Sequence, residues 1–242
     1  MSHENWQSIW ARRGTSDASG LSLEELLRLD GFDSGAACID PQDWRSYAQD
    51  LANRLNIREG QSVFEIGCGA GAFLAALSET RSIVVGGIDY AEGLIGNARQ
   101  ALPQGSFQVG DAEALEPAPP AHHVIANSVF QYFPLGKAGN ILQRMLSKAA
   151  MTVAVLDIPN RETQAECEAV RRAALPEAEY ERKYAGLEHT YFDRDWFACQ
   201  VNPDEWRCET IDGFIPNYTQ NQFRFAALYR RVTPLITPTE RI

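Results

Sequence analysis

A glycine-rich turn is the strongest chemical signal in the sequence. The segment EIGCGAG (65–71) follows the apolar run 62–67 and precedes the helical pattern 72–79. Glycines permit positive φ angles and let the backbone approach a ligand closely, while the start of the next helix directs free N–H groups toward that ligand. The spacing is G-x-G-x-G, so the third glycine comes one residue earlier than in the dinucleotide fingerprint G-x-G-x-x-G. The turn therefore favours a ligand other than a dinucleotide.

Three acidic residues end three successive predicted strands. Glu65 ends the first strand, Asp89 ends the second, and Asp111 follows the third. The carboxyl ends of parallel strands meet at one edge of a sheet, so we expect these side chains to share one crevice. Glu65 suits a cationic group, Asp89 can accept hydrogen bonds from both hydroxyls of a ribose, and Asp111 is expected beside an adenine ring. The pattern matches adenosine that carries a sulfonium amino acid, which is S-adenosylmethionine.

With these residues the chain resembles the class I S-adenosylmethionine-dependent methyltransferases. The resemblance is good over about 41–158 and extends in outline to the last strand pair. It implies that the glycines contact the methionine and ribose, and that the third acid and the residue after it bind adenine. The residues that it assigns to the cofactor are Glu65, Gly67, Gly69, Gly71, Asp89, Asp111, Ala112 and Asn127. His122 and His123 depart from the usual Phe-Asp, but they enter the fourth strand far from the cofactor, so we expect a structural role.

Short apolar runs alternate with helical patterns from residue 41 to residue 158. Runs that are apolar on both faces and separated by helices predict a parallel sheet covered on both sides. The predicted strands are 62–67, 82–89, 106–110, 123–129, 151–158, 205–214 and 222–232, and the predicted helices between them are 41–56, 72–79, 92–102 and 137–150. The fold class is α/β: a doubly wound, Rossmann-like, seven-stranded and mostly parallel sheet with helices on both faces. The resemblance implies that its last strand is antiparallel.

The chain divides at about residue 40. Residues 1–40 are polar, with one short helical pattern at 21–29, and are predicted to be a loosely attached N-terminal segment or cap. Residues 41–242 form the predicted methyltransferase domain, with a helical, lid-like insertion at about 160–200. Trp6, Trp10 and Arg13 share one helical face, so they either close over the cofactor or pack on the core.

Three residues near the expected crevice are candidates for catalysis. His189 follows the helical insertion, and a neutral imidazole is the usual base near pH 7, so it is predicted to be a base or an acceptor ligand. Tyr191 beside it is a weaker candidate. Asp157 ends the fifth strand, where it binds an acceptor amine, orients a base or caps the next helix.

Other residues are predicted to contact the acceptor. Gln131 and Tyr132 follow the fourth strand, and Trp10 belongs to the predicted cap. Arg224, in the last strand, either meets an acidic group of the acceptor or forms a surface ion pair. The aromatic stripe from Phe223 to Tyr229 is either sheet core or a dimer face.

Charge and cysteine usage exclude several classes of function. The chain has 22 Lys and Arg against 32 Asp and Glu, a formal charge of −10. This charge disfavours nucleic acid and anionic membranes as partners. No apolar stretch is long enough for a membrane span, and the first residues lack a signal-peptide core, so a cytoplasmic location is expected. The five cysteines contain no C-x-x-C pair, which indicates neither a disulfide framework nor a zinc site, and no metal is predicted.

The predicted function is transfer of a methyl group from S-adenosylmethionine, by in-line displacement, to O or N of a small molecule, leaving S-adenosylhomocysteine. A sugar, an amino acid or a natural-product intermediate fits as the acceptor, and a base is needed only where the acceptor must lose a proton. The protein is expected to be a monomer or a homodimer. One alternative is a non-catalytic module that binds the cofactor. The other, an NAD-dependent oxidoreductase, is disfavoured by the glycine spacing.

Overall fold

The computed structural model describes residues 6, 8–14, 21–33, 38–184 and 187–233. The strands are β1 (Ser62–Ile66), β2 (Val84–Asp89), β3 (Ser106–Val109), β4 (Ala121–Asn127), β5 (Ala149–Pro159), β6 (Trp206–Asp212) and β7 (Arg224–Arg231). They form one sheet in the order β3-β2-β1-β4-β5-β7-β6. The first five are mutually parallel, and β7 is antiparallel to both of its neighbours, β5 and β6. The predicted fold class is confirmed.

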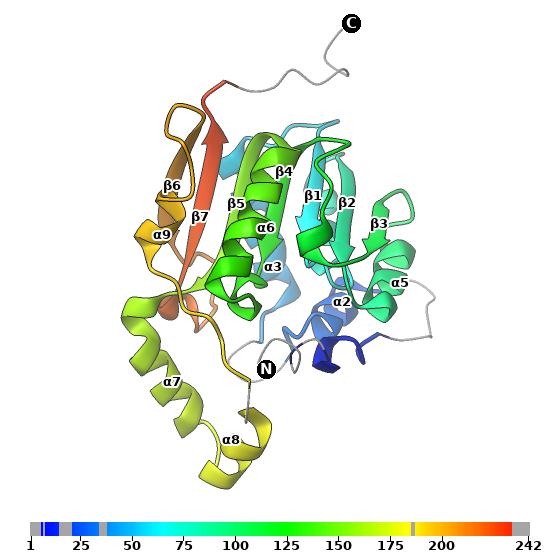
Figure 1. The fold of residues 1–242 in the computed structure, drawn as a ribbon. Coiled ribbons are helices and arrows are strands. Elements are labelled where there is room, and N and C mark those ends of the chain that lie inside the picture. Colours follow the sequence, from blue (N-terminus) through cyan, green and yellow to red (C-terminus); the bar gives the residue numbers. More distant parts are fainter. Residues whose placement is uncertain (1–5, 7, 15–20, 34–37, 185–186, 234–242) are drawn as a thin grey trace, which may run out of the picture.

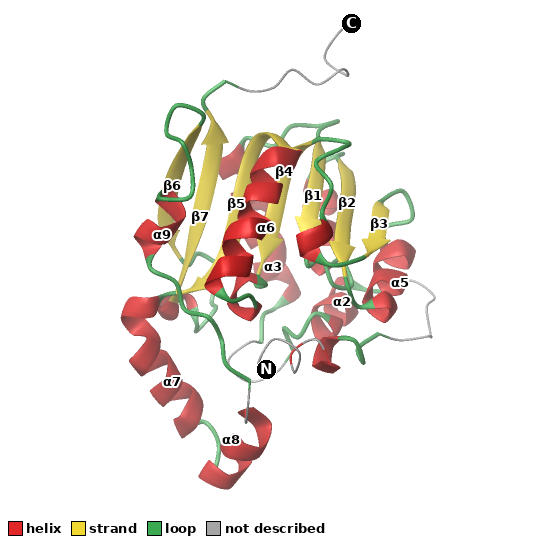
Figure 2. Cartoon of the chain, in the orientation of Figure 1, coloured by secondary structure: helices red, strands yellow, loops and turns green. Residues whose placement is uncertain are grey.

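Helices cover both faces of the sheet (Figures 1 and 2). The helices are α2 (Leu23–Leu29), α3 (Pro41–Leu55), α4 (Ala72–Thr80), α5 (Glu92–Ala101), α6 (Leu135–Lys148), α7 (Gln164–Ala173), α8 (Glu177–Tyr184) and α9 (Arg194–Ala198). Short 3₁₀ turns are η2 (Ala112–Ala114), η3 (Phe130–Tyr132), η4 (Arg161–Thr163) and η5 (Asn221–Phe223). Buried side chains of α2 to α5 belong to one core layer, and those of α6 and α9 belong to the other.

The helix predicted over 41–56 shows how local sequence sets an element. Asp40 is the N-cap and accepts a hydrogen bond from the Gln42 backbone N–H at 2.7 Å, and Pro41 suits the first turn. The apolar residues at helical spacing are buried on one face. Trp44 Nε1 donates to the Ala72 carbonyl at 3.1 Å. This bond ties α3 to the start of α4, directly after the glycine turn.

The prediction that residues 1–40 are loosely attached is wrong for the described residues 21–33. Ser22 and Glu25 form a reciprocal capping box that starts α2. All four leucines of the helix are buried in the core layer shared with α3 and α4. Burial of a leucine contributes roughly 1.5–3 kcal/mol, so α2 is a stable part of the domain. The helix ends at Asp30, at the carboxyl edge of the sheet.

The two histidines of β4 are structural, as predicted. His123 is fully buried, with Nδ1 at 2.7 Å from Thr152 Oγ1 and Nε2 at 2.9 Å from Gln61 Oε1. Burial lowers the pKa of His123 to about 3, so the ring is neutral at physiological pH. His122 Nδ1 accepts from the Ser62 backbone N–H at the amino end of β1.

The carboxyl ends of the parallel strands meet the added segments. Figure 1 shows α2 and the blue N-terminal residues at this edge, and α7 and α8 projecting beside it from the body of the molecule. The aromatic stripe of β7 is buried within the sheet core, so its interpretation as a dimer face is wrong for this fold. The same edge holds every group described next.

Candidate active site

The glycine turn joins β1 to α4. Its backbone angles and close packing leave room for glycine only. Gly67, Gly69 and Gly71 have φ angles of +66°, +52° and +86°, a region that other residues adopt only with strain. A Cβ on Gly67 would lie 2.6 Å from Val129 Cγ2, and a Cβ on Gly69 would collide with the carboxylate of Asp30. The turn thus brings bare backbone to the edge of the sheet.

Asp89 holds the second strand against this turn. Its Oδ2 accepts from the Gly69 backbone N–H at 3.0 Å, and its Oδ1 accepts from the Ala91 N–H at 2.9 Å. Burial raises the pKa of Asp89, and these hydrogen bonds oppose the rise. Each carboxylate oxygen has a second lone pair, so Asp89 can still accept two hydroxyl groups.

Two cavities run along the carboxyl edge. The larger, of about 210 Å³, is lined by Glu65, Gly67, Gly69 and Asp89 at one end and by Asp157 and Arg224 at the other. The smaller, of about 40 Å³, is lined by Gly110, Asp111 and Ala112. The residues that line both cavities are Gly67, Asp89, Tyr90, Val129 and Tyr132. Because the two cavities share these lining residues, they lie side by side and suit one ligand that occupies both.

Most of the predicted site residues line these cavities. Besides those named above, the larger cavity is lined by Trp10, Asn127, Gln131 and His189. Asn127 Oδ1 accepts from Tyr47 Oη at 3.1 Å, which anchors the end of β4 to α3. Gly71 is not among the residues that line either cavity; it is the N-cap of α4. Asp111 caps η2 by accepting from the Glu113 N–H at 2.9 Å.

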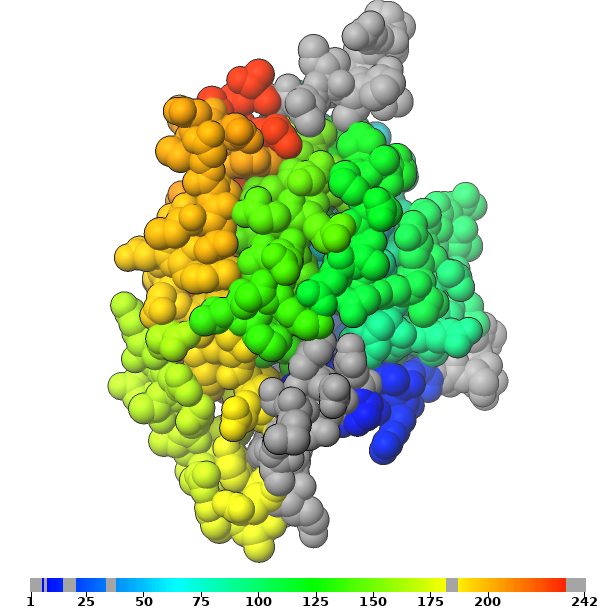
Figure 3. Space-filling view, in the orientation of Figure 1, coloured from blue at the N-terminus to red at the C-terminus, as the bar shows by residue number. Residues whose placement is uncertain are grey.

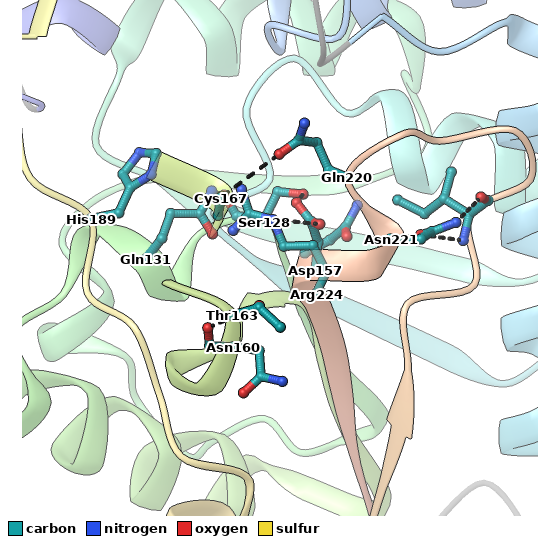
Figure 4. A network of polar contacts seen from close by, with 12 residues as sticks. Ser128, Gln131, Asp157, Asn160, Thr163, Cys167, His189, Gln220, Asn221 and Arg224 are labelled. Carbon is teal, nitrogen blue, oxygen red and sulfur yellow. Dashed lines mark hydrogen bonds and ion pairs between the residues drawn. The ribbon is translucent and has the colours of Figure 1, made fainter. Parts of the chain in front are cut away.

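The ends of β4 and β5 carry backbone strain. Ser128 and Asp157 both have φ of 54°, unusual for residues other than glycine. Ser128 Oγ donates to Asp157 Oδ2 at 2.7 Å (Figure 4). The pairing of β5 with β7 shifts register between Val155 and Ile158, next to Asp157. Strain of this kind concentrates where a side chain is directed into a functional site.

Arg224 is buried beside Asp157, so its interpretation as a paired surface arginine is wrong. The side chain of Arg224 is 7% exposed, and its Nε lies 3.6 Å from Asp157 Oδ1. Among the described residues, Nε and Nη1 of Arg224 and Oδ1 of Asp157 have no hydrogen-bond partner. Asp157 also does not cap the next helix, because Asn160 caps η4. A buried guanidinium with unsatisfied N–H groups therefore lines the cavity.

His189 lies at the same end of the cavity. Its Nδ1 is 3.1 Å from Arg171 Nη2, and its Nε2 is buried without a partner among the described residues. A guanidinium only donates hydrogen bonds, so Nδ1 accepts and the proton of the neutral ring is assigned to Nε2. Burial, with Arg171 and then Arg224 adding to it, lowers the pKa of His189 well below 6.5. The ring therefore presents an N–H donor at physiological pH.

Tyr191 is not brought to the cavity. It is buried with Cys167 and Phe223 in a separate small cluster, and it does not belong to the lining of either cavity. Its position gives no support to the prediction that it takes part in catalysis. Sequence proximity to His189 does not bring Tyr191 to the cavity, because its side chain packs with Cys167 and Phe223 instead.

The described N-terminal aromatic residues cover the junction of the two cavities. Trp6 stacks on His189 with ring centroids 5.0 Å apart and donates from Nε1 to the Glu188 carbonyl at 3.1 Å. Both Trp6 and Trp10 contact the ring of Tyr132. Figure 3 shows the blue residues of this segment lying against the lower edge of the body. That these residues close over a bound cofactor stays a prediction.

The sheet order, the glycine turn and the row of strand-end acids are similar to those of class I S-adenosylmethionine-dependent methyltransferases. Residues 63–151 match the family model described as "Methyltransferase domain". Trans-aconitate 2-methyltransferase from Azoarcus sp. (strain BH72) is 37% identical over 89 residues, which are 36% of this chain and 35% of that protein. The protein of the same name from Methylobacterium nodulans is 33% identical over 90 residues, 36% of this chain and 34% of that one. The chain thus spans about a third of the length of these curated relatives.

Solved structures share the whole fold. The N-methyltransferase NodS from Bradyrhizobium japonicum WM9 has a TM-score of 0.62 at 14% identity, over 96% of this chain and 100% of that one. Magnesium protoporphyrin IX methyltransferase from Synechocystis PCC 6803 has a TM-score of 0.54 at 16% identity, over 94% and 92%. The fold predicted from the sequence is confirmed, and residues 63–151 match a methyltransferase domain, as the resemblance implied.

The residues present fit S-adenosylmethionine. The two cavities are lined by the glycine turn and by the strand-end acids, and Glu65 is 3% exposed with Oε2 unpaired among the described residues. A buried carboxylate without a partner is costly unless a cationic ligand group satisfies it. The described chain contains no group of three His, Cys, Asp or Glu side chains that could hold a metal ion. It also contains no helix long and apolar enough to cross a membrane.

Proposed function

We propose that this protein transfers the methyl group of S-adenosylmethionine to a carboxylate oxygen of a small organic acid. The observation that carries the proposal is the buried guanidinium of Arg224, which lines the same cavity as the glycine turn and whose Nε and Nη1 have no hydrogen-bond partner among the described residues. Guanidinium groups recognise carboxylates through charge-assisted hydrogen bonds. Similarity to trans-aconitate 2-methyltransferases supports the proposal, because the name of these relatives describes an acidic acceptor. The proposal narrows the acceptor predicted from the sequence.

In this proposal Arg224 and His189 orient the acceptor. Arg224 supplies a positive charge and hydrogen-bond donors, and His189 supplies the Nε2–H donor. When bound, the cofactor supplies an electrophilic methyl group on its sulfonium. Fixed orientation of the attacking oxygen provides most of the rate in such a displacement. Trp6, Trp10 and Tyr132 cover the cavity and exclude water, which strengthens the interactions inside it.

No general base is needed for a carboxylate acceptor. A carboxylic acid is ionised near pH 7, so the attacking oxygen carries no proton. The pKa of His189 is lowered by burial and by Arg171 and Arg224, which makes its ring a weak base. Of the two roles predicted from the sequence, we therefore propose that of acceptor ligand.

Substitution of His189 distinguishes a hydrogen-bond donor from a base. We expect His189→Gln, which keeps an N–H donor, to hold kcat within about threefold, and His189→Ala to raise the KM for the acid by roughly tenfold. The kcat of the wild-type protein should be flat between about pH 6 and pH 8. Glu188→Gln, at an exposed neighbouring side chain, is the matched control. A loss of more than a hundredfold in kcat in both His189 variants would instead establish a base.

The proposed function is tested by product analysis. Purified protein is incubated with methyl-labelled S-adenosylmethionine and separate panels of small dicarboxylic and tricarboxylic acids, amines and sugars. We expect label in an acid product that dilute alkali releases as methanol, because methyl esters hydrolyse and N-methyl groups do not. Label in alkali-stable products alone would refute the carboxylate acceptor. Cofactor binding without transfer to any panel would favour the non-catalytic module.

Four expectations from the sequence accompany this proposal. The acidic charge of −10 favours a small metabolite over nucleic acid as the acceptor. The expected cytoplasmic location and the monomeric or homodimeric state remain predictions. Residues 161–184, which form α7 and α8 beside the acceptor end of the cavity, are proposed as the acceptor-selecting insertion.

A further inference from the structure

Asp30, at the C-cap of α2, is a cavity residue that the sequence analysis did not predict. It is 40 residues from the glycine turn, yet its Oδ1 accepts from the Ala70 N–H at 2.6 Å and its Oδ2 accepts from the Ala72 N–H at 3.1 Å. Its carboxylate occupies the space that a side chain on Gly69 would need. Asp30 also lines the larger cavity with Glu65 and Asp89.

Capping of α4 explains only part of this arrangement. The helix N-cap, Gly71, has no side chain, so Asp30 supplies the missing acceptor from another element. Asp30 also lines the cavity beside two other carboxylates, those of Glu65 and Asp89. The charge of Asp30 adds to burial in raising the pKa of Glu65, and the charge of Asp89 adds to burial in raising the pKa of Asp30. Among the described residues, neither Asp30 nor Glu65 forms an ion pair with a basic side chain.

The second observation is the orphaned oxygen of Glu65. This side chain is 3% exposed, lines the cavity, and has Oε2 buried with no partner among the described residues. Burial, followed by the charges of Asp30 and Asp89, raises the pKa of Glu65 well above its ordinary value. Burial likewise raises the pKa of Asp30 to about 7. A cationic ligand group between these carboxylates would relieve both the repulsion and the missing hydrogen bond.

We propose that Asp30 is a cofactor-binding residue that, together with Glu65, binds the ammonium group of the amino-acid part of S-adenosylmethionine. The inference rests on the proposed function only in taking this molecule as the ligand. It makes α2 part of the cofactor site. The turn after α2 is held by Arg13, whose Nη1 donates to the Leu29 carbonyl at 3.1 Å and whose guanidinium lies over the Trp10 ring.

The test compares two ligands that differ in the amino-acid part. S-Adenosylhomocysteine carries the ammonium group, whereas 5′-methylthioadenosine keeps the adenosine and thioether but lacks the whole amino-acid part. By calorimetry we expect Asp30→Asn to lower the affinity for S-adenosylhomocysteine about 30-fold. The affinity for 5′-methylthioadenosine should change by less than about threefold. Asp33→Asn, at an exposed position three residues further along, should change neither.

The outcomes separate this inference from the proposed function. If Asp30→Asn lowers the affinity for both ligands equally, or for neither, Asp30 only caps α4 and the inference is overturned. If the folded wild-type protein binds neither ligand, the cofactor assignment itself fails. Retained binding of 5′-methylthioadenosine by Asp30→Asn also shows that the variant folds and keeps the adenosine end of the site.

Discussion

Arg224→Met is expected to lower kcat/KM for the acidic acceptor by roughly 10²- to 10⁴-fold while leaving the affinity for S-adenosylhomocysteine within about threefold. The reason is that Arg224 lines the cavity with Nε and Nη1 lacking hydrogen bonds among the described residues, and a charge-assisted hydrogen bond to the acceptor contributes about 1.5–3 kcal/mol. Methionine retains the length and apolar stem of the side chain, so packing against β5 is largely kept. Methyl transfer and calorimetric titration of the same sample provide the measurement.

Two further variants control this result. Arg224→Lys keeps the charge but loses the planar pair of donors, so we expect an intermediate loss. Arg230→Met removes an arginine from the same strand at a position that does not line the cavity, and should leave transfer unchanged. Equal activity of Arg224→Met and wild type would exclude Arg224 from acceptor binding.

Asp89→Asn is expected to lower the affinity for S-adenosylhomocysteine by about 100-fold. The carboxylate has free lone pairs for two hydroxyls, whereas the amide keeps only one acceptor oxygen and directs an N–H₂ group at the other partner. The amide can still accept from one of the two backbone N–H groups that Asp89 now binds, at Gly69 and Ala91. We therefore expect the melting temperature to fall by only a few degrees.

The control for Asp89→Asn is Glu92→Gln, an exposed residue at the start of α5. It removes one negative charge from the same connection without touching the cavity. Calorimetric titration of both variants distinguishes a direct contact from a general charge effect, because a charge effect would lower the affinity of both variants alike. Unchanged affinity in a folded Asp89→Asn sample would remove this residue from the cofactor site.

The sequence predicted the parts of the site that local pattern determines. The glycine turn and the acids after β1, β2 and β3 lie at the ends of consecutive strands, and the parallel sheet alone brings such positions together. The strand and helix positions followed from apolar periodicity, and α3 began at its predicted cap, Asp40. No contact between distant segments was needed for these predictions.

The remaining parts depend on tertiary contacts that spacing does not encode. Asp30 reaches the glycine turn only because α2 packs on α4, and the polar composition of residues 1–40 concealed its four buried leucines. Arg224 is buried because β7 pairs with β5 across an irregular register. The tautomer assigned to His189 depends on a hydrogen bond from Arg171, 18 residues away on α7. The capping pattern of LSLEELLRL was the one available signal that residues 21–29 form a stable helix.

The central claim is that the cavity at the carboxyl edge holds S-adenosylmethionine. The most direct measurement is calorimetric titration of the purified protein with S-adenosylhomocysteine, with NAD as the comparison ligand. We predict one binding site per chain with micromolar affinity and no binding of NAD. Binding of NAD alone, or binding of neither ligand by a folded sample, would contradict the account.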